Sequence, residues 1–131
     1  MTAERFEVTT KNGYNLTMVR ILTTDTGTYD GTQGPVLLVG GPRYNSSQWI
    51  AGANFDDMEG GPDTAPQQLF DAGYDVWIAV PRGEIMSRSH ESFDPDGPDE
   101  ADGAAAYWNF GVEDIAKEDI TAMINKILET R

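Results

Sequence analysis

The distribution of hydrophobic and polar residues predicts strands in the first part of the chain. Residues 5–10 and 14–23 are rich in β-branched and aromatic residues, and the intervening Asn12-Gly13 is a strong hairpin signal. A polar, Gly-rich stretch at 24–34 is predicted to be a loop. The continuous apolar runs at 35–40 (PVLLVG) and 74–80 (YDVWIAV) are typical of strands buried on both faces, as in a parallel sheet.

Two further segments carry helix signals. Thr64 and Gln67 have the spacing of a capping box, and Gly73 suits the position after a short helix at 65–72. Beyond residue 111, apolar residues recur with a period near 3.6, which predicts one long helix with a single core-facing side. Strands that alternate with helices predict an α/β sheet with right-handed crossovers. The apolar positions of the long helix are Val112, Ile115, Ala116, Ile120, Met123, Ile124, Ile127 and Leu128.

Charge and composition exclude several classes of function. The 131 residues include 22 acidic and 9 basic ones, a formal net charge of −13. This balance argues against a nucleic-acid binder and against docking on anionic membranes. The acidic residues concentrate in two Gly/Pro/Asp-rich stretches, 54–63 and 93–102, which are predicted to be surface loops. No apolar run approaches the length of a transmembrane span, and we expect no cofactor.

Five segments in collinear order resemble the acid lipases, the group of gastric and lysosomal lipases. The most specific parts are "DAGYDVW", the "RG" that follows it, and the spacing W-x-F…E-x-x-A-K-x-D near the C-terminus. The resemblance extends over almost the whole chain. The segments are FEVTTKNGYNLTMVRI, PVLLVGGPRYNSSQWI, LFDAGYDVWIAVPRG, SRSH and YWNFGVEDIAKEDITAMINKILE.

The resemblance implies an α/β-hydrolase, of which residues 1–131 are the N-terminal third: an antiparallel hairpin, then parallel strands with crossover helices. In that fold the nucleophile lies in G-x-S-x-G on the following strand, a motif that these residues do not contain. The implied function is hydrolysis of acyl esters of neutral lipids, by an enzyme that is secreted or lysosomal. We therefore expect no catalytic triad residue here, and a second polypeptide that completes the sheet. The alternative is a non-catalytic module used for binding or assembly.

The resemblance also implies half of an oxyanion hole after the first buried strand. The family has H-G-L at this place, and alignment on Trp49 puts Gly40, Gly41 and Pro42 there. Proline has no backbone N–H to donate, and a lost oxyanion donor costs on the order of 3 kcal/mol, or 10² to 10³ in rate. If the loop carries one extra residue, Gly41 becomes the donor instead.

For the remaining candidate residues we prefer a structural role to a catalytic or metal-binding one. His90 lies in the SRSH segment, where the family also carries a histidine that is not its catalytic one, so we expect a structural role. The three aspartates of the second acidic stretch could bind Ca²⁺, but their spacing is not that of an EF-hand, so a solvated loop is the default. Arg82 and Arg88 could pair with these acids. The three aspartates are Asp94, Asp96 and Asp99.

Two N-glycosylation sequons begin at Asn15 and Asn45. Both fit a secretory route, although a glycan at Asn45 would crowd the oxyanion loop. We predict glycosylation at both as a working hypothesis.

Overall fold

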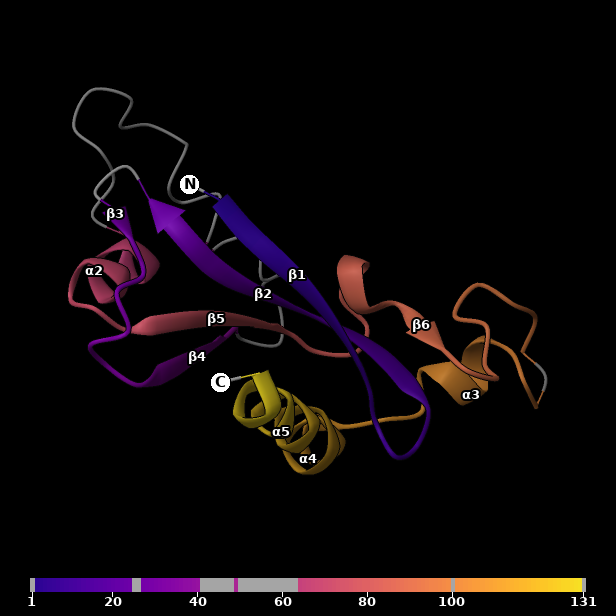
Figure 1. Ribbon diagram of the computed structural model, residues 1–131. Helices are drawn as coiled ribbons and strands as arrows, with labels where there is room; N and C mark the ends of the chain where they lie inside the picture. The colour runs from indigo at the N-terminus through magenta and orange to yellow at the C-terminus, as the bar shows by residue number, and fades with distance from the viewer. Residues whose placement is uncertain (1, 25–26, 41–48, 50–63, 100, 131) are drawn as a thin grey trace, which may run out of the picture. The chain divides into compact units, whose positions relative to one another are not determined.

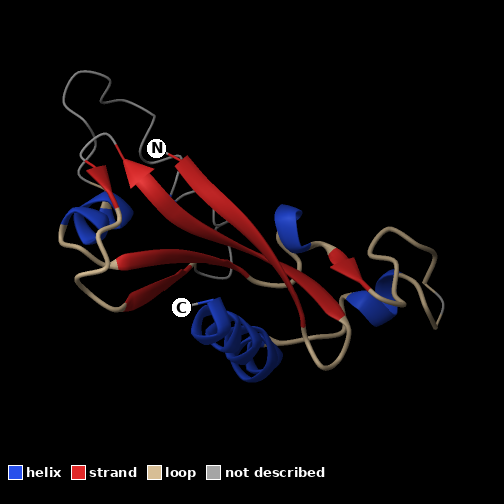
Figure 2. Cartoon of the chain, in the orientation of Figure 1, coloured by secondary structure: helices blue, strands red, loops and turns tan. Residues whose placement is uncertain are grey.

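The computed structural model describes residues 2–24, 27–40, 49, 64–99 and 101–130, and it contains a mixed sheet with a few helices (Figure 1). The strands are β1 (Thr2–Thr9), β2 (Tyr14–Thr24), β3 (Gly27–Thr28), β4 (Pro35–Val39), β5 (Asp75–Val80) and β6 (Ser89–His90). The sheet order is β1-β2-β5-β4, and β3 and β6 both pair with β2. This mixed sheet with a few helices is consistent with part of an α/β fold. Figure 2 shows β1 and β2 as the expected antiparallel hairpin.

The helical elements are short except for the last one. They are α2 (Ala65–Asp71), the 3₁₀ turn η1 (Ile85–Ser87), α3 (Ala104–Tyr107), α4 (Val112–Asp114), the π-helical turn η2 (Ile115–Asp119) and α5 (Ile120–Thr130). Among the described residues, no helix combines the length and apolar character needed to cross a membrane.

The chain divides into two compact units. The first unit holds residues 1–6 and 19–79, and the second holds 7–18 and 80–131. Strands β1 and β2 contribute residues to both units, so the sequence alternates between them. Each unit is described separately below.

The first unit contains the parallel pair that the two apolar runs predicted. β4 and β5 run parallel, in register from Pro35 opposite Asp75 to Val39 opposite Ala79. β5 is fully buried, whereas β4 is only half-buried and Val39 is 40% exposed. β4 is the last strand in the sheet order, with β5 as its neighbour among the described strands. Among the described strands, β4 is therefore the edge of the sheet, with an apolar sequence that pairs in parallel.

One face of this sheet packs a small core. Its buried members come from β2, α2 and β5, and Trp49 packs against them. The N-terminus of α2 is capped as predicted, since the Thr64 side chain accepts from the Gln67 backbone N–H, and Gly73 follows the helix with φ of 91°. A side chain at position 73 would collide with the Thr32 hydroxyl. The buried core members are Val19, Ile21, Phe70, Val76 and Ile78.

The polar stretch at 24–34 is not entirely a loop. Gly27 and Thr28 form β3, which pairs antiparallel with Thr24 and Thr23 at the end of β2. A two-residue strand has no period that a sequence pattern could reveal. The prediction was therefore wrong only at this short extension of the hairpin.

In the second unit, the predicted long helix is divided. α4, the π turn η2 and α5 follow one another, and the buried positions are Asp119, Met123 and Ile127. Val112, Ile124 and Leu128 are instead 70%, 45% and 64% exposed. The expected apolar face is thus buried at Met123 and Ile127 but not at Val112, Ile124 and Leu128, and Asp119 takes a buried position beside it.

Candidate functional site

The candidate oxyanion loop begins where β4 ends. In sheets of parallel strands, ligands bind beyond the carboxyl ends of the strands, and Gly40 is the first residue after the carboxyl end of β4. Gly40 is half-buried. Gly41, Pro42 and Asn45 lie outside the described residues. Which of the two residues after Gly40 supplies an oxyanion donor therefore stays a prediction.

A buried ion pair lies just after β5. The Arg82 guanidinium donates from Nε and Nη2 to Asp119 Oδ1, at 2.9 and 2.7 Å, and the Arg82 backbone N–H donates to Asp119 Oδ2 at 2.9 Å. The two side chains are 1% and 0% exposed. The sequence led us to expect that Arg82 pairs with the acidic stretch. That expectation was wrong, because the partner is a helical aspartate 37 positions away.

Aromatic rings surround this pair. The Arg82 guanidinium lies 3.8 Å from the centre of the Tyr14 ring, and Tyr14 donates its hydroxyl to the carbonyl oxygen of Tyr107 at 2.6 Å. A guanidinium over an aromatic face is attracted by the ring quadrupole. The Arg82 Nη2 also reaches Asn12 Oδ1 at 3.4 Å, which links the pair to the β1–β2 turn.

Gly83 explains why the "RG" and the W-x-F segments belong together. Gly83 has φ of 88°, and a Cβ there would lie 3.0 Å from Trp108 and 3.2 Å from Phe110. Glycine is thus required both by the backbone conformation and by the aromatic rings packed against it. The "RG" and W-x-F parts of the family resemblance therefore meet in one cluster, where these contacts are structural.

The two buried tyrosines of this cluster give a measurable consequence. Burial raises the pKa of both Tyr14 and Tyr107 above the usual phenol value. Their contribution to stability is therefore present below the unfolded-state pKa of about 10 and is lost as the pH rises through the folded-state value. In an alkaline absorbance titration, we expect Tyr14 and Tyr107 to ionise above the usual phenol range. Tyr14→Phe should remove one of these late steps, and an unchanged late amplitude in that variant would contradict the prediction.

His90 has the structural contacts that we expected. Its Nε2 lies 2.7 Å from the Asn12 carbonyl oxygen, and its Nδ1 accepts from the backbone N–H groups of Ser92 and Phe93 at 2.9 and 3.1 Å. The neighbouring Ser87 hydroxyl donates to the Val80 carbonyl and accepts from the Thr17 N–H. These hydrogen bonds occupy the Ser87 hydroxyl and both His90 nitrogens, the groups that a catalytic nucleophile and its general base would use.

The described part of the acidic stretch is organised by local pairs. Arg88 donates to both carboxylate oxygens of Asp96 at 2.7 and 2.6 Å, which confirms the expected pairing of this arginine. This hydrogen-bonded guanidinium holds the pKa of Asp96 below its usual range. Asp94 Oδ1 accepts from the Asp96 N–H. Among the described residues no group of three acidic or histidine side chains is arranged to hold a metal ion, and calcium binding stays a hypothesis.

The first sequon lies within the sheet. Asn15 is in β2, its Nδ2 donates to Ser89 Oγ at 3.1 Å, and its Oδ1 accepts from the Thr9 hydroxyl at 2.9 Å. Thr17 of the same sequon is buried. A glycan on Asn15 would replace one of the two Nδ2 hydrogens beside Ser89, and glycosylation at this position stays a prediction.

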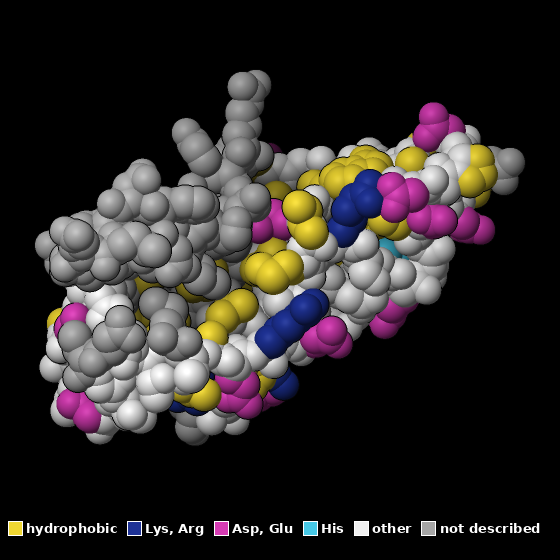
Figure 3. Space-filling view, turned by 90° about the horizontal axis from the view of Figure 1, so that it is seen from above, with side chains coloured by type: hydrophobic (Ala, Val, Ile, Leu, Met, Phe, Trp, Pro, Cys, Tyr) yellow, Lys and Arg dark blue, Asp and Glu magenta, His cyan; other side chains and the backbone are white. Residues whose placement is uncertain are grey.

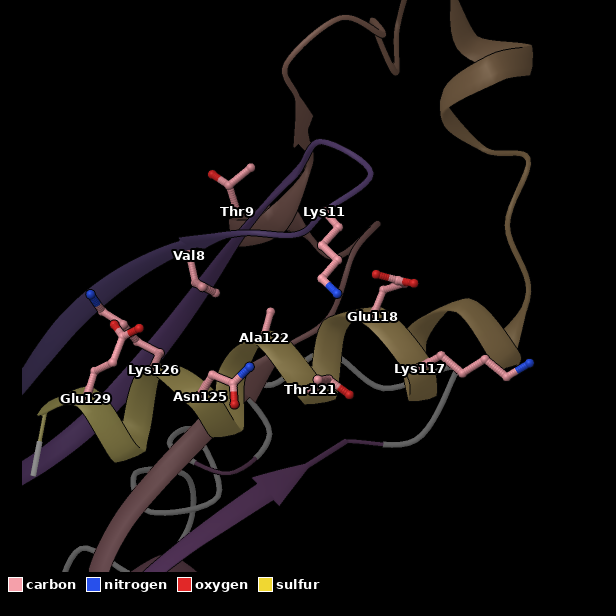
Figure 4. Close-up of a pocket in the computed structure, with 10 residues that line it drawn as sticks. All are labelled: Val8, Thr9, Lys11, Lys117, Glu118, Thr121, Ala122, Asn125, Lys126 and Glu129. Carbon is pink, nitrogen blue, oxygen red and sulfur yellow. The ribbon is translucent and has the colours of Figure 1, made fainter.

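A cavity of about 280 Å³ in the second unit does not suit an acyl chain. It lies between the end of β1 with its turn and one face of the η2–α5 helix (Figure 4). Lys11 and Glu118 approach each other across it, whereas Lys117 extends away from it. Sites for apolar ligands are lined mainly by hydrophobic side chains, and this lining is polar and of mixed charge. Exposed hydrophobic side chains lie elsewhere on the described surface (Figure 3).

Comparison with known proteins gives a consistent picture. Human lipase member K is 33% identical over 129 residues, which cover 96% of this chain and 28% of that protein. The chain is related to the acid lipases. Rat gastric triacylglycerol lipase is 30% identical over 127 residues, and Caenorhabditis elegans lipase lipl-1 is 32% identical over 127 residues. The acid-lipase-like chain thus spans 28–29% of the length of these relatives. No family model matches it.

Proposed function

We propose that this chain is the N-terminal part of a lipase-like serine ester hydrolase that acts on acyl esters of neutral lipids. The observation that carries the proposal is the similarity to lipases over 95–96% of the chain, in relatives that include a gastric triacylglycerol lipase. The catalytic serine, aspartate and histidine are supplied by polypeptide outside residues 1–131. The contribution of residues 1–131 is the oxyanion loop at Gly40–Pro42.

The edge of the sheet supports a completing partner. β4 is half-buried and apolar, and it has β5 on one side among the described strands. A strand that runs parallel to β4 would satisfy its outward N–H and C=O groups and cover Val39. We infer that the segment with the nucleophile supplies this strand, either as a second polypeptide or as more of the same protein. Residues 1–131 are then one segment of a single α/β-hydrolase domain.

A second function is favoured by Pro42. If this residue takes the position of the oxyanion donor, the completed protein lacks a backbone N–H that stabilises the transition state. The chain would then belong to a catalytically silent α/β-hydrolase-fold protein, used for binding or assembly. In either case we propose a secreted or lysosomal location, with Asn45 as the glycosylation site.

A fluorophosphonate probe separates the two functions. We expect the probe, applied to the native protein, to label a serine in a G-x-S-x-G segment outside residues 1–131. Heat-denatured protein is the matched control, because labelling requires an activated serine. Labelled native protein supports the hydrolase, and a folded protein with a completed sheet but no labelling supports the silent module.

A further inference from the structure

His90 joins three segments of the second unit. It ends β6, which pairs with the start of β2, so that Tyr14 lies opposite His90. Its ring stacks on Phe93 with centroids 4.2 Å apart and meets the Tyr14 ring edge-on at 4.6 Å. Through Nε2 the ring also contacts the carbonyl of Asn12 in the β1–β2 turn. One imidazole therefore connects the hairpin turn to the residues that begin the acidic stretch.

The hydrogen bonds define the protonation state of this ring. Nδ1 faces two backbone N–H donors, from Ser92 at 2.9 Å and from Phe93 at 3.1 Å, so it must carry a lone pair. Nε2 then carries the hydrogen and donates to the Asn12 carbonyl at 2.7 Å. A neutral imidazole can act as acceptor at one nitrogen and donor at the other, whereas the protonated ring donates at both. The pair of bonds at Nδ1 exists only with the neutral ring.

We propose that His90 is a proton-sensitive latch, whose neutral ring holds residues 92–93 and whose protonated ring releases them. A proton added at Nδ1 points at two N–H groups, which lose their acceptor and are repelled. The bond from Nε2 to Asn12 survives, because the protonated ring still donates there. The ring therefore stays on the hairpin turn while the start of the acidic stretch comes free.

The β1–β2 turn leaves the His90 ring little space to move away from residues 92–93 when it is protonated. Gly13 has φ of 92°, and a Cβ there would lie 2.8 and 2.9 Å from Cε1 and Nε2 of His90. The backbone on both sides is fixed as well, since the Glu91 N–H donates to the Gly13 carbonyl at 2.8 Å. The repulsion that protonation causes is then relieved by a movement of residues 92–93 rather than by a shift of the imidazole.

The charged groups around the ring act in both directions. Glu91, the adjacent residue, attracts a protonated imidazole. Arg82 reaches the Asn12 side chain from the other side, and Lys11 lies in the same turn; both disfavour added positive charge. Tyr14 contributes a neutral phenol ring edge-on. The two opposed N–H donors at Nδ1 determine which residues the protonated ring releases.

The latch acts on a limited segment. The rest of the acidic stretch has tethers that do not involve the imidazole: the Asp94 N–H donates to the Asp102 carbonyl, Trp108 Nε1 donates to the Pro95 carbonyl, and Arg88 pairs with Asp96. Opening is therefore expected at the amides of residues 92 and 93 and not at Asp94. This difference between neighbouring amides distinguishes the latch from general unfolding at low pH.

His90 is the one histidine of residues 1–131, and the signal that His90→Phe removes assigns its imidazole in the complete protein. In protein labelled with ¹⁵N-histidine, we expect this signal to be that of the tautomer protonated at Nε2 at about pH 7.5. Between about pH 7.5 and pH 5, hydrogen-exchange protection of residues 92 and 93, corrected for intrinsic rates, should fall at least about tenfold. The Asp94 amide is the internal reference and should keep its protection.

His90→Phe is the matched variant, because it keeps an aromatic ring against Phe93 and removes both nitrogens. It should give low protection at residues 92 and 93 at both pH values. A tautomer protonated at Nδ1, or equal protection of wild-type residues 92 and 93 at both pH values, would overturn the proposal. If the variant fails to fold, the wild-type tautomer and exchange measurements decide by themselves.

Discussion

Asp119→Ala is expected to lower the free energy of unfolding by about 3–5 kcal/mol, among the largest effects of any single substitution in this chain. The Asp119 carboxylate accepts three hydrogen bonds from Arg82, and both side chains are almost completely buried. Alanine leaves a guanidinium and a backbone N–H without their acceptor in a buried site, which costs far more than the ion pair gains. Denaturant unfolding of the purified protein measures the change.

The exposed pair of Arg88 and Asp96 is the matched control. It also joins two guanidinium N–H donors to one carboxylate, but Asp96 is 68% exposed, so Asp96→Ala should leave the unfolding midpoint nearly unchanged. Removing both buried charges, as in Arg82→Met with Asp119→Leu, should restore part of the lost stability, since no uncompensated charge remains. Equal effects of Asp119→Ala and Asp96→Ala would show that burial of the pair does not matter.

Pro42→Leu is expected to raise the rate of ester hydrolysis by about 10² to 10³ if Pro42 occupies the oxyanion-donor position. Leucine restores the backbone N–H that proline lacks and is the residue that the family has there. The assay is hydrolysis of a soluble activated ester by the protein together with the segment that carries the nucleophile. The gain should be in kcat, because the bond is made to the developing oxyanion and not to the ground-state ester.

Gly41→Pro provides the reciprocal test. If the loop carries one extra residue, Gly41 is the donor, and this variant should lose about 10² to 10³ in rate while Pro42→Leu has little effect. A rate that neither substitution changes would place the oxyanion donors elsewhere. The two variants thus separate an intact oxyanion loop from an impaired one within the same protein.

The elements that the sequence predicted correctly are those with a local signal. The apolar runs became β4 and β5 in parallel register, the Asn12-Gly13 turn joins β1 to β2, and Thr64 caps α2. Each of these depends on a few adjacent residues with a strong preference. The short strands β3 and β6 have no such signal, because each is defined by its pairing with β2.

The pairing of Arg82 with Asp119 could not be read from a pattern. A charged residue such as Asp119 is ordinarily expected on the solvent side of a helix, and the acidic stretch offered Arg82 many nearer partners. Both residues lie in the segments that resemble the acid lipases. That resemblance indicates that the two positions matter, but it does not show that their side chains pair. The candidate site itself stays a prediction, since of its three residues the structure describes Gly40 alone.

The π turn at Ile115–Asp119 has a consequence for how the C-terminal helix tolerates change. A π turn holds one residue more than a regular α turn, so the loss of one residue here can be absorbed by a return to α geometry that keeps Met123 and Ile127 on the buried side. The same loss within α5 would instead turn everything after it by about 100° around the helix axis. The π turn is therefore the place in this helix where a one-residue deletion disturbs the buried side least.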